Sequence, residues 1–291
     1  MRFANLEEPP PEQARVTLLP IPYGNTLTYG KGAAKGPEAL LRASGHMELF
    51  DETLLQETYR IGFHTRPLLP SHPDGPEAMQ ARIYKAATTE LNAGRFLAAI
   101  GGEHGITPAL VRAHRDHFGS ELSVLQIDAH ADLRERYDDT QWSHACVMRR
   151  IYDLGLPFVQ VGLRSLSLEE WHFIRDQDLM DRIYWARDIV PQSRGGDHRW
   201  MDELVARLAD RVYISFDLDG LDPSVMPATG TPEPGGLDYH MAVELMARVF
   251  AQREVVGLDL VELAPIEGQP ASDFSAARLL YRMLGYRFPL T

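Results

Sequence analysis

Apolar residues along the chain fall into short runs that alternate with longer amphipathic stretches. Each run is nearly continuously apolar and then ends in Gly, Asp or Pro, which is typical of a buried strand in a parallel sheet. Six such runs predict strands, and a seventh at Ile183–Ala186 predicts a shorter one. The six are Val16–Tyr23, Arg95–Gly102, Leu122–His130, Phe158–Ser165, Arg211–Asp219 and Val255–Leu263.

The stretches between these runs predict helices. Gly36–Phe50 carries an early proline, Ala78–Gly94 ends at a glycine, and Tyr239–Gln252 follows the favourable N-cap Asp238. Arg194–Trp200 indicates a surface turn rather than a domain boundary. Alternating strands and helices predict a parallel sheet covered by helices on both faces. We therefore expect an α/β protein, a single-domain three-layer α/β/α sandwich over residues 1–291, with residues 1 to about 15 as an N-terminal extension.

Composition narrows the class of partner. The chain has 29 basic and 41 acidic residues and a formal net charge of −12, which disfavours nucleic-acid and membrane partners and suits a cationic ligand. The single cysteine, Cys146, fits a reducing compartment and is expected to be a small buried hydrophobe. No apolar run approaches the roughly 20 residues that span a bilayer, and the N-terminus does not resemble a signal peptide. We expect a cytoplasmic protein.

Ligand-type side chains follow four of the predicted strands. In parallel α/β folds, functional groups gather at the carboxyl ends of strands, so these side chains are expected to meet. Four aspartates and two histidines are more than one divalent ion needs, which predicts two ions that share carboxylates. An oxygen-rich set with imidazole and no thiolate favours manganese, so we expect two Mn²⁺ per subunit. The expected ligands are His104, Asp128, His130, Asp132, Asp217 and Asp219.

Five motifs contain or surround these residues: GGEH (101–104), DAHAD (128–132), SFDLDGLDPS (215–224), PATGTPEPGGL (227–237) and GLDLVELAP (257–265). They resemble the signatures of the ureohydrolase (arginase/agmatinase) family, and agmatinases most of all. The resemblance covers the chain from about Val16 to Phe288 and keeps the family's order and spacing. It implies an arginase-like fold, a dimanganese centre, and hydrolysis of a guanidinium group to urea and a primary amine.

The resemblance also implies a role for each residue. His144 matches the family's proton shuttle and is expected to work near its ordinary pKa. Glu262 matches the glutamate that binds the guanidinium, and Asp132 is expected to orient the attacking hydroxide. By position, His104 and Asp132 would hold one ion, His130 and Asp219 the other, and Asp128 and Asp217 would bridge.

Two departures from the family's common pattern stand beside these residues. The usual GGDHS is GGEHG here, with Glu103 and Gly105, and Ala145 replaces a glycine after His144. Neither change touches an expected ligand. We expect Glu103 to support neighbouring ligands rather than to bind metal.

The loop Leu133–Ser143 carries the main clue to the substrate. Its acids outnumber its bases, which disfavours a substrate carboxylate and tolerates an ammonium tail. Asp138 and Asp139 are therefore expected to bind substrate together with Glu262 and His144. We expect agmatine (giving putrescine) or N1-aminopropylagmatine (giving spermidine) rather than arginine. The alternative is that these acids form a solvated face of the loop.

Other functions remain open at this point. One is a ureohydrolase for guanidinobutyrate, guanidine or arginine. A second is a non-catalytic homologue, although such a protein would be expected to have lost ligands. A third is a deacetylase-type hydrolase of similar fold, which would use one zinc ion and fewer ligands. The resemblance further implies a homo-oligomer, either a trimer or a hexamer.

Overall fold

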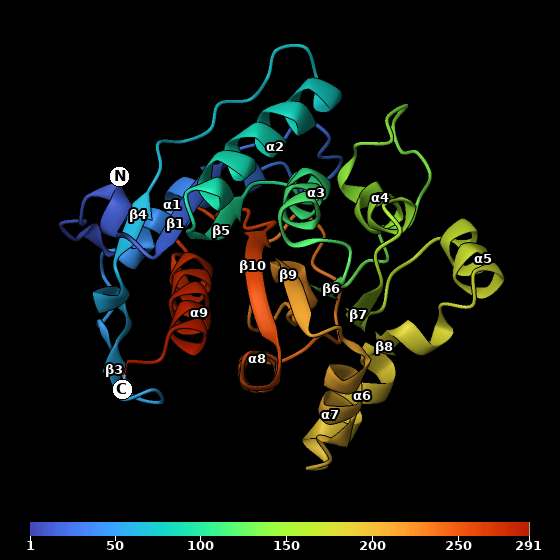
Figure 1. Ribbon diagram of the computed structural model, residues 1–291. Coiled ribbons are helices and arrows are strands. Elements are labelled where there is room, and N and C mark those ends of the chain that lie inside the picture. Colours follow the sequence, from blue (N-terminus) through green and yellow to red (C-terminus); the bar gives the residue numbers. More distant parts are fainter. Residues whose placement is uncertain (291) are drawn as a thin grey trace.

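The computed structural model describes residues 1–290, and within them eight parallel strands form one sheet between two layers of helices (Figure 1). The strand order is β4-β1-β5-β10-β9-β6-β7-β8. This confirms the predicted α/β/α sandwich. The bounds are β1 Val16–Ile21, β4 Phe63–Thr65, β5 Phe96–Gly101, β6 Leu122–Ile127, β7 Phe158–Leu163, β8 Ile183–Trp185, β9 Arg211–Asp217 and β10 Glu254–Val261.

Helices bury both faces of the sheet, and for this reason the strands are almost continuously apolar. One core packs α1, α6, α7, α8 and α9 against the sheet, and the other packs α2, α3, α4 and α5. Within residues 1–290, no helix is both long and apolar enough to cross a membrane. The bounds are α1 Gly36–Ser44, α2 Pro76–Asn92, α3 Thr107–Phe118, α4 Val147–Asp153, α5 Leu168–Asp176, α6 Ala186–Arg194, α7 Arg199–Arg207, α8 Tyr239–Gln252 and α9 Ala271–Arg287.

The seven predicted strands end one to three residues earlier than expected, and one predicted helix ends six residues earlier. The strand predicted to reach His130 ends at Ile127, and the chain then bends at Ala129. The helix predicted to reach Phe50 ends at Ser44, and Phe50 instead begins the small antiparallel pair of β2 (Phe50–Asp51) and β3 (Gln56–Glu57). The predicted surface turn is confirmed between the end of α6 and the start of α7.

The N-terminal residues pack onto the sandwich. The buried ring of Phe3 lies 5.6 Å from the ring of Phe63 on β4 and 6.3 Å from that of Tyr281 on α9. The backbone N–H of Ala4 donates to the hydroxyl of Ser44 at the end of α1 (2.8 Å). This segment therefore closes one end of the apolar core.

The order of the central strands positions the candidate site. The four strands that the ligand-type residues follow are β5, β10, β9 and β6, and these are consecutive neighbours in the sheet. Since all four are parallel, their carboxyl ends lie along one edge. Residues as distant in sequence as His104 and Glu262 are thereby brought together.

Candidate metal centre

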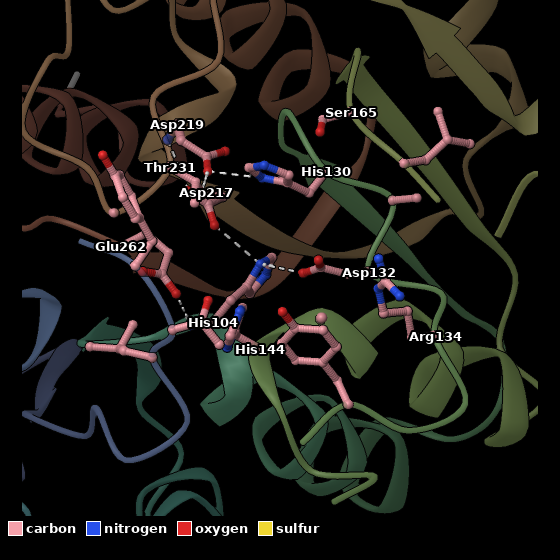
Figure 2. Close-up of a pocket in the computed structure, with 18 of the residues that line it drawn as sticks. His104, His130, Asp132, Arg134, His144, Ser165, Asp217, Asp219, Thr231 and Glu262 are labelled. Atoms are coloured by element: carbon pink, nitrogen blue, oxygen red, sulfur yellow. Dashed lines mark hydrogen bonds and ion pairs between the residues drawn. The ribbon is translucent and has the colours of Figure 1, made fainter. Parts of the chain in front are cut away.

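The carboxyl ends of the four central strands surround a cavity of about 270 Å³. Five of the six expected ligands line it, and so do Glu262 and His144. The sixth ligand, Asp128, is 1% exposed and its Oδ2 lies 3.1 Å from Nδ1 of His104. The six were expected from the sequence to meet, and the structure brings them together, as Figure 2 shows for the five that line the cavity.

His104 forms the centre of a first cluster. Its Nδ1 atom lies 3.1 Å from Oδ2 of Asp132 and 3.3 Å from Oδ2 of Asp217 (Figure 2), and it also lies 3.1 Å from Oδ2 of Asp128. This nitrogen is buried and has no hydrogen-bond partner within residues 1–290. A buried nitrogen that faces three carboxylates is a favourable arrangement for a divalent cation.

His130 forms the centre of a second cluster. Its Nδ1 atom lies 3.0 Å from Oδ2 of Asp219 and 3.5 Å from Oδ1 of Asp128. Asp128 therefore presents one oxygen to each imidazole. The two clusters share this carboxylate, as a pair of neighbouring ions requires.

The charges of the clusters fit cations. Burial, together with the charge of Asp128, raises the pKa of Asp132 to about 7. Burial and the carboxylates of Asp219 and Asp128 raise the pKa of Asp217 well above its usual value. Burial alone would lower the pKa of His104, yet its three aspartate neighbours raise it. Divalent ions would relieve this repulsion, so the residues fit two of them.

The backbone is strained where two of the acids enter the site. Asp132 and Glu262 have left-handed φ angles of 53° and 65°. This conformation costs roughly 1–2 kcal/mol for a residue with a side chain. Hydrogen bonds hold it: the Asp132 carbonyl accepts from Met148 N (2.9 Å) and Arg149 N (3.1 Å), and Glu262 N donates to the Gly102 carbonyl (2.8 Å).

Glu262 and His144 face the same cavity. Oε1 of Glu262 accepts a hydrogen bond from the backbone N–H of His104 (2.6 Å), and burial raises the pKa of this carboxyl to about 8. Burial lowers the pKa of His144 to about 4, whereas the sequence interpretation assumed an ordinary value. The His144 imidazole is therefore neutral at physiological pH and can accept a proton.

A comparison with known protein families shows to which family the chain belongs. The arginase family model matches residues 14–285, nearly the whole length. The chain belongs to the arginase family. Arginase-family proteins are binuclear metal enzymes, which agrees with the paired clusters around His104 and His130.

Relatives of this arginase-family chain cover almost all of it. It is 39% identical to the N(1)-aminopropylagmatine ureohydrolase of Synechocystis sp. over 94% of this chain and 89% of the relative. It is also 39% identical to an enzyme of the same name from Thermus thermophilus, over 97% of this chain and 93% of the relative. The solved structure of agmatine ureohydrolase from Thermoplasma volcanium is 28% identical, with a TM-score of 0.84 over 96% of this chain and 92% of that one.

Behind the first cluster lies a hydrogen-bond network that sequence reasoning missed. Nε2 of His104 lies 2.8 Å from the hydroxyl of Ser215, which donates to Asp259 (2.7 Å). Asp259 also accepts from the hydroxyls of Tyr213 (2.8 Å) and Thr107 (3.0 Å). An acid in the middle of the apolar run of β10 was the available signal. The network fixes which nitrogen His104 presents to the cavity.

We expect Asp259→Asn to weaken metal binding. The amide would place a donor against groups that already donate, which releases Ser215 and the His104 ring. Partners of this kind typically contribute about 10–100-fold to metal affinity, and a loss of that size is expected in a Mn²⁺ titration. Glu254→Gln, at the exposed start of the same strand, is the matched control. An unchanged Mn²⁺ dissociation constant in Asp259→Asn would contradict this role.

The acids of the loop Leu133–Ser143 do not enter the cavity. Asp138 and Asp139 are exposed and are not among its lining residues, and Glu135 pairs with Arg149. The loop instead contributes Arg134 and Tyr137 to the wall, with the guanidinium 5.1 Å above the ring. Substrate contact by Asp138 and Asp139 therefore stays a prediction, and any effect of theirs would act from outside the wall.

Proposed function

We propose that this chain is a dimanganese ureohydrolase that cleaves the guanidinium group of N1-aminopropylagmatine, releasing urea and spermidine, with agmatine as the alternative substrate. The observation that carries the proposal is the pair of clusters around His104 and His130, which face the buried carboxylate of Glu262 across one cavity. Support for the longer substrate comes from the names of the relatives at 39% identity. Agmatinases of Pyrococcus and Bacillus are 27–28% identical.

The ligands are assigned from the shared geometry. We assign one Mn²⁺ to His104 and Asp132 and the other to His130 and Asp219, as the two clusters suggest. Asp128, which faces both imidazoles, and Asp217 would bridge. Manganese suits a donor set of carboxylate oxygens and imidazole without thiolate. Bound there, the ions would lower the pKa of a water molecule and make it nucleophilic near neutral pH.

Glu262 would bind and orient the substrate. Its Oε1 is held by the His104 backbone, and Oε2 is directed toward Gly230 on the cavity wall. A guanidinium beside this buried carboxyl would restore its ionised form, since burial, together with the charges of Glu103 and Asp219, raises its pKa to about 8. Paired hydrogen bonds from a planar guanidinium would then fix the carbon over the metal site. Asp132 would orient the attacking hydroxide by a hydrogen bond.

His144 would move the proton that the leaving amine needs. Since burial lowers its pKa to about 4, it is neutral and has one ring nitrogen free to accept. Neutral imidazole can take a proton released during attack and pass it to the departing nitrogen. The ring lies in the cavity wall beside Ala145 and Tyr137, whose ring centroid is 5.8 Å away.

The cationic tail of the bound substrate would extend along the side of the cavity that α5 and the loop before it form. Glu170 is buried there and accepts hydrogen bonds from Leu133 N (3.0 Å) and Ser167 N (2.7 Å). Its charge offsets that of Arg134, 3.9 Å away. Asp138 and Asp139 would add attraction for an ammonium tail from the outer surface.

We also propose that the protein is cytoplasmic and forms a homo-oligomer, either a trimer or a hexamer. Sedimentation velocity would test the oligomeric state.

A urea-release assay with Mn²⁺ tests the substrate. We expect kcat/KM to be highest for N1-aminopropylagmatine, lower for agmatine, and lower again for guanidinobutyrate and arginine. Arginine carries an α-carboxylate, which would have to lose its hydration beside acidic side chains of the site at a cost of a few kcal/mol. This cost should reduce kcat/KM for arginine by roughly 100-fold or more. A higher kcat/KM with agmatine than with aminopropylagmatine would assign agmatine. Arginine as the best substrate would refute the proposal.

A further inference from the structure

The hydroxyl of Thr26 lies between the buried carboxylate of Glu103 and the ring of His144. Thr26 is in the loop after β1, and both its backbone N–H (2.8 Å) and its hydroxyl (2.9 Å) donate to Glu103. The same hydroxyl oxygen is 3.2 Å from Nδ1 of His144 and accepts from the His144 backbone N–H (3.2 Å). Glu103 is fully buried, and Thr26 is nearly so.

A count of hydrogens gives these bonds a direction. A threonine hydroxyl has one proton and two lone pairs. With Glu103 ionised, its two oxygens accept the backbone N–H and the hydroxyl proton of Thr26, so the Thr26 oxygen can only accept from His144. One lone pair receives the backbone N–H, and the other is left for Nδ1, which must then carry a hydrogen. Nε2, which has no hydrogen-bond partner within residues 1–290, is left unprotonated on a ring that lines the cavity.

One other hydroxyl approaches the ring. Ser143 Oγ lies 3.4 Å from Nδ1 and also accepts from the Ala145 backbone N–H at 3.4 Å. If Ser143 donated its proton to Nδ1, the opposite tautomer would result. The contact is longer than that of Thr26, so the geometry favours Thr26 as the partner of Nδ1.

Gly105 leaves the room that this arrangement needs. A Cβ atom at position 105 would lie 3.0 Å from Oε1 of Glu103, 3.2 Å from the Trp142 carbonyl and 3.4 Å from the backbone nitrogen of His144. A side chain there would therefore press on both the carboxylate and the histidine loop. Glu103 and Gly105, the two departures within the GGEHG motif, are in this way one coupled feature.

We propose that Glu103 and Thr26 are positioning residues, which hold the neutral His144 imidazole as its Nδ1–H tautomer so that Nε2 receives the proton during catalysis. This inference rests on the proposed function, in which His144 transfers a proton. In the opposite tautomer, Nε2 would carry a hydrogen and could not accept one. Proton transfer by a positioned side chain contributes about 10²–10⁴-fold to rate, so a mixed tautomer population should reduce kcat clearly.

The matched pair Thr26→Val and Thr26→Ser tests the proposal with Mn²⁺-loaded enzyme. Valine keeps the shape of threonine and removes the hydroxyl, while serine keeps the hydroxyl. We expect Thr26→Val to lower kcat by roughly 10–100-fold with KM changed less than about threefold, and Thr26→Ser to restore kcat to within about threefold. Thr89→Val, on the exposed face of α2, makes the same chemical change away from the site and should leave kcat unchanged.

A spectroscopic measurement reads the tautomer directly. Enzyme with ¹⁵N-labelled histidine, loaded with diamagnetic Mg²⁺ or Zn²⁺, should give a protonated-type Nδ1 and a bare-type Nε2 signal for His144, assigned by their absence in His144→Asn. This measurement also decides the matter if Thr26→Val fails to fold. An Nε2–H signal would overturn the proposal, and so would wild-type kcat in a fully metallated Thr26→Val.

The variant Ser143→Ala tests whether Ser143, rather than Thr26, is the hydrogen-bond partner that orients Nδ1 of His144. A loss of kcat in Ser143→Ala with none in Thr26→Val would assign the orientation to Ser143 and refute the role of Thr26. Failure of the proposed function would look different. Wild-type enzyme would then release no urea from any guanidino compound, while its His144 signals could still report the Nδ1–H tautomer.

Discussion

Asp217→Asn is expected to remove bound metal and urea release together. The Asp217 carboxylate lies 3.3 Å from Nδ1 of His104, within the cluster that would hold the first ion. A neutral amide cannot balance a divalent charge, and its NH₂ group would face the cation. Loss of a bridging ligand should remove several kcal/mol of stabilisation and so lower kcat by roughly 10³-fold or more. Metal analysis and a urea assay on the same preparation measure both effects, and Asp128→Asn should behave alike.

The two ends of β9 supply the control for this experiment. Asp210 immediately precedes the strand and is exposed, whereas Asp217 ends it inside the cavity. Asp210→Asn should keep wild-type metal content and rate. Full activity in Asp217→Asn despite depleted metal would show that the reaction does not depend on a two-metal site.

Glu262→Gln is expected to weaken productive substrate binding strongly while leaving the metal in place. The glutamine keeps the size of the side chain and can still accept from the His104 backbone. It loses the charge that would pair with a guanidinium. Removing one partner of a buried, hydrogen-bonded charge pair costs about 2–5 kcal/mol, so kcat/KM should fall by roughly 30- to 5,000-fold. Steady-state urea release measures the change.

Glu267→Gln is the control for this variant, because Glu267 is exposed only five positions further along the chain. It should retain wild-type kinetics. Metal content in Glu262→Gln should stay at the wild-type level, which separates substrate binding from assembly of the metal site. If kcat/KM of Glu262→Gln for the best substrate equalled that of the wild type, another group would have to bind the guanidinium.

Much of the site could be predicted because its ligands lie at the ends of recognisable strands. Asp128, His130, Asp217 and Asp219 interrupt or follow runs that are otherwise apolar, and a parallel sheet collects such positions along one edge. The family resemblance then supplied roles for His144 and Glu262. The architecture itself followed from alternating apolar runs and amphipathic stretches.

What escaped prediction depends on long-range packing. Nothing in local sequence says that β10 and β9 insert between β5 and β6, although this order brings Glu262 beside His104. The pKa of His144 is set by burial that only the folded loop creates. Asp138 and Asp139 were expected near substrate from charge alone, but the turn of the loop directs them outward.

The acidic cluster also bears on how this fold can change under selection. The raised pKa values of Asp132, Asp217 and Glu262 mean that, in the metal-free chain, these three carboxyls bind protons more tightly when folded than when unfolded. Their contribution to stability therefore declines as pH rises from about 4, the unfolded value, through the folded values. Neutral residues at these three positions would remove this loss of stability at higher pH. At Asp132 and Glu262, glycine would also remove the strain of the left-handed backbone angle. Laboratory evolution for heat resistance alone would thus drive the chain toward a robust but inert scaffold.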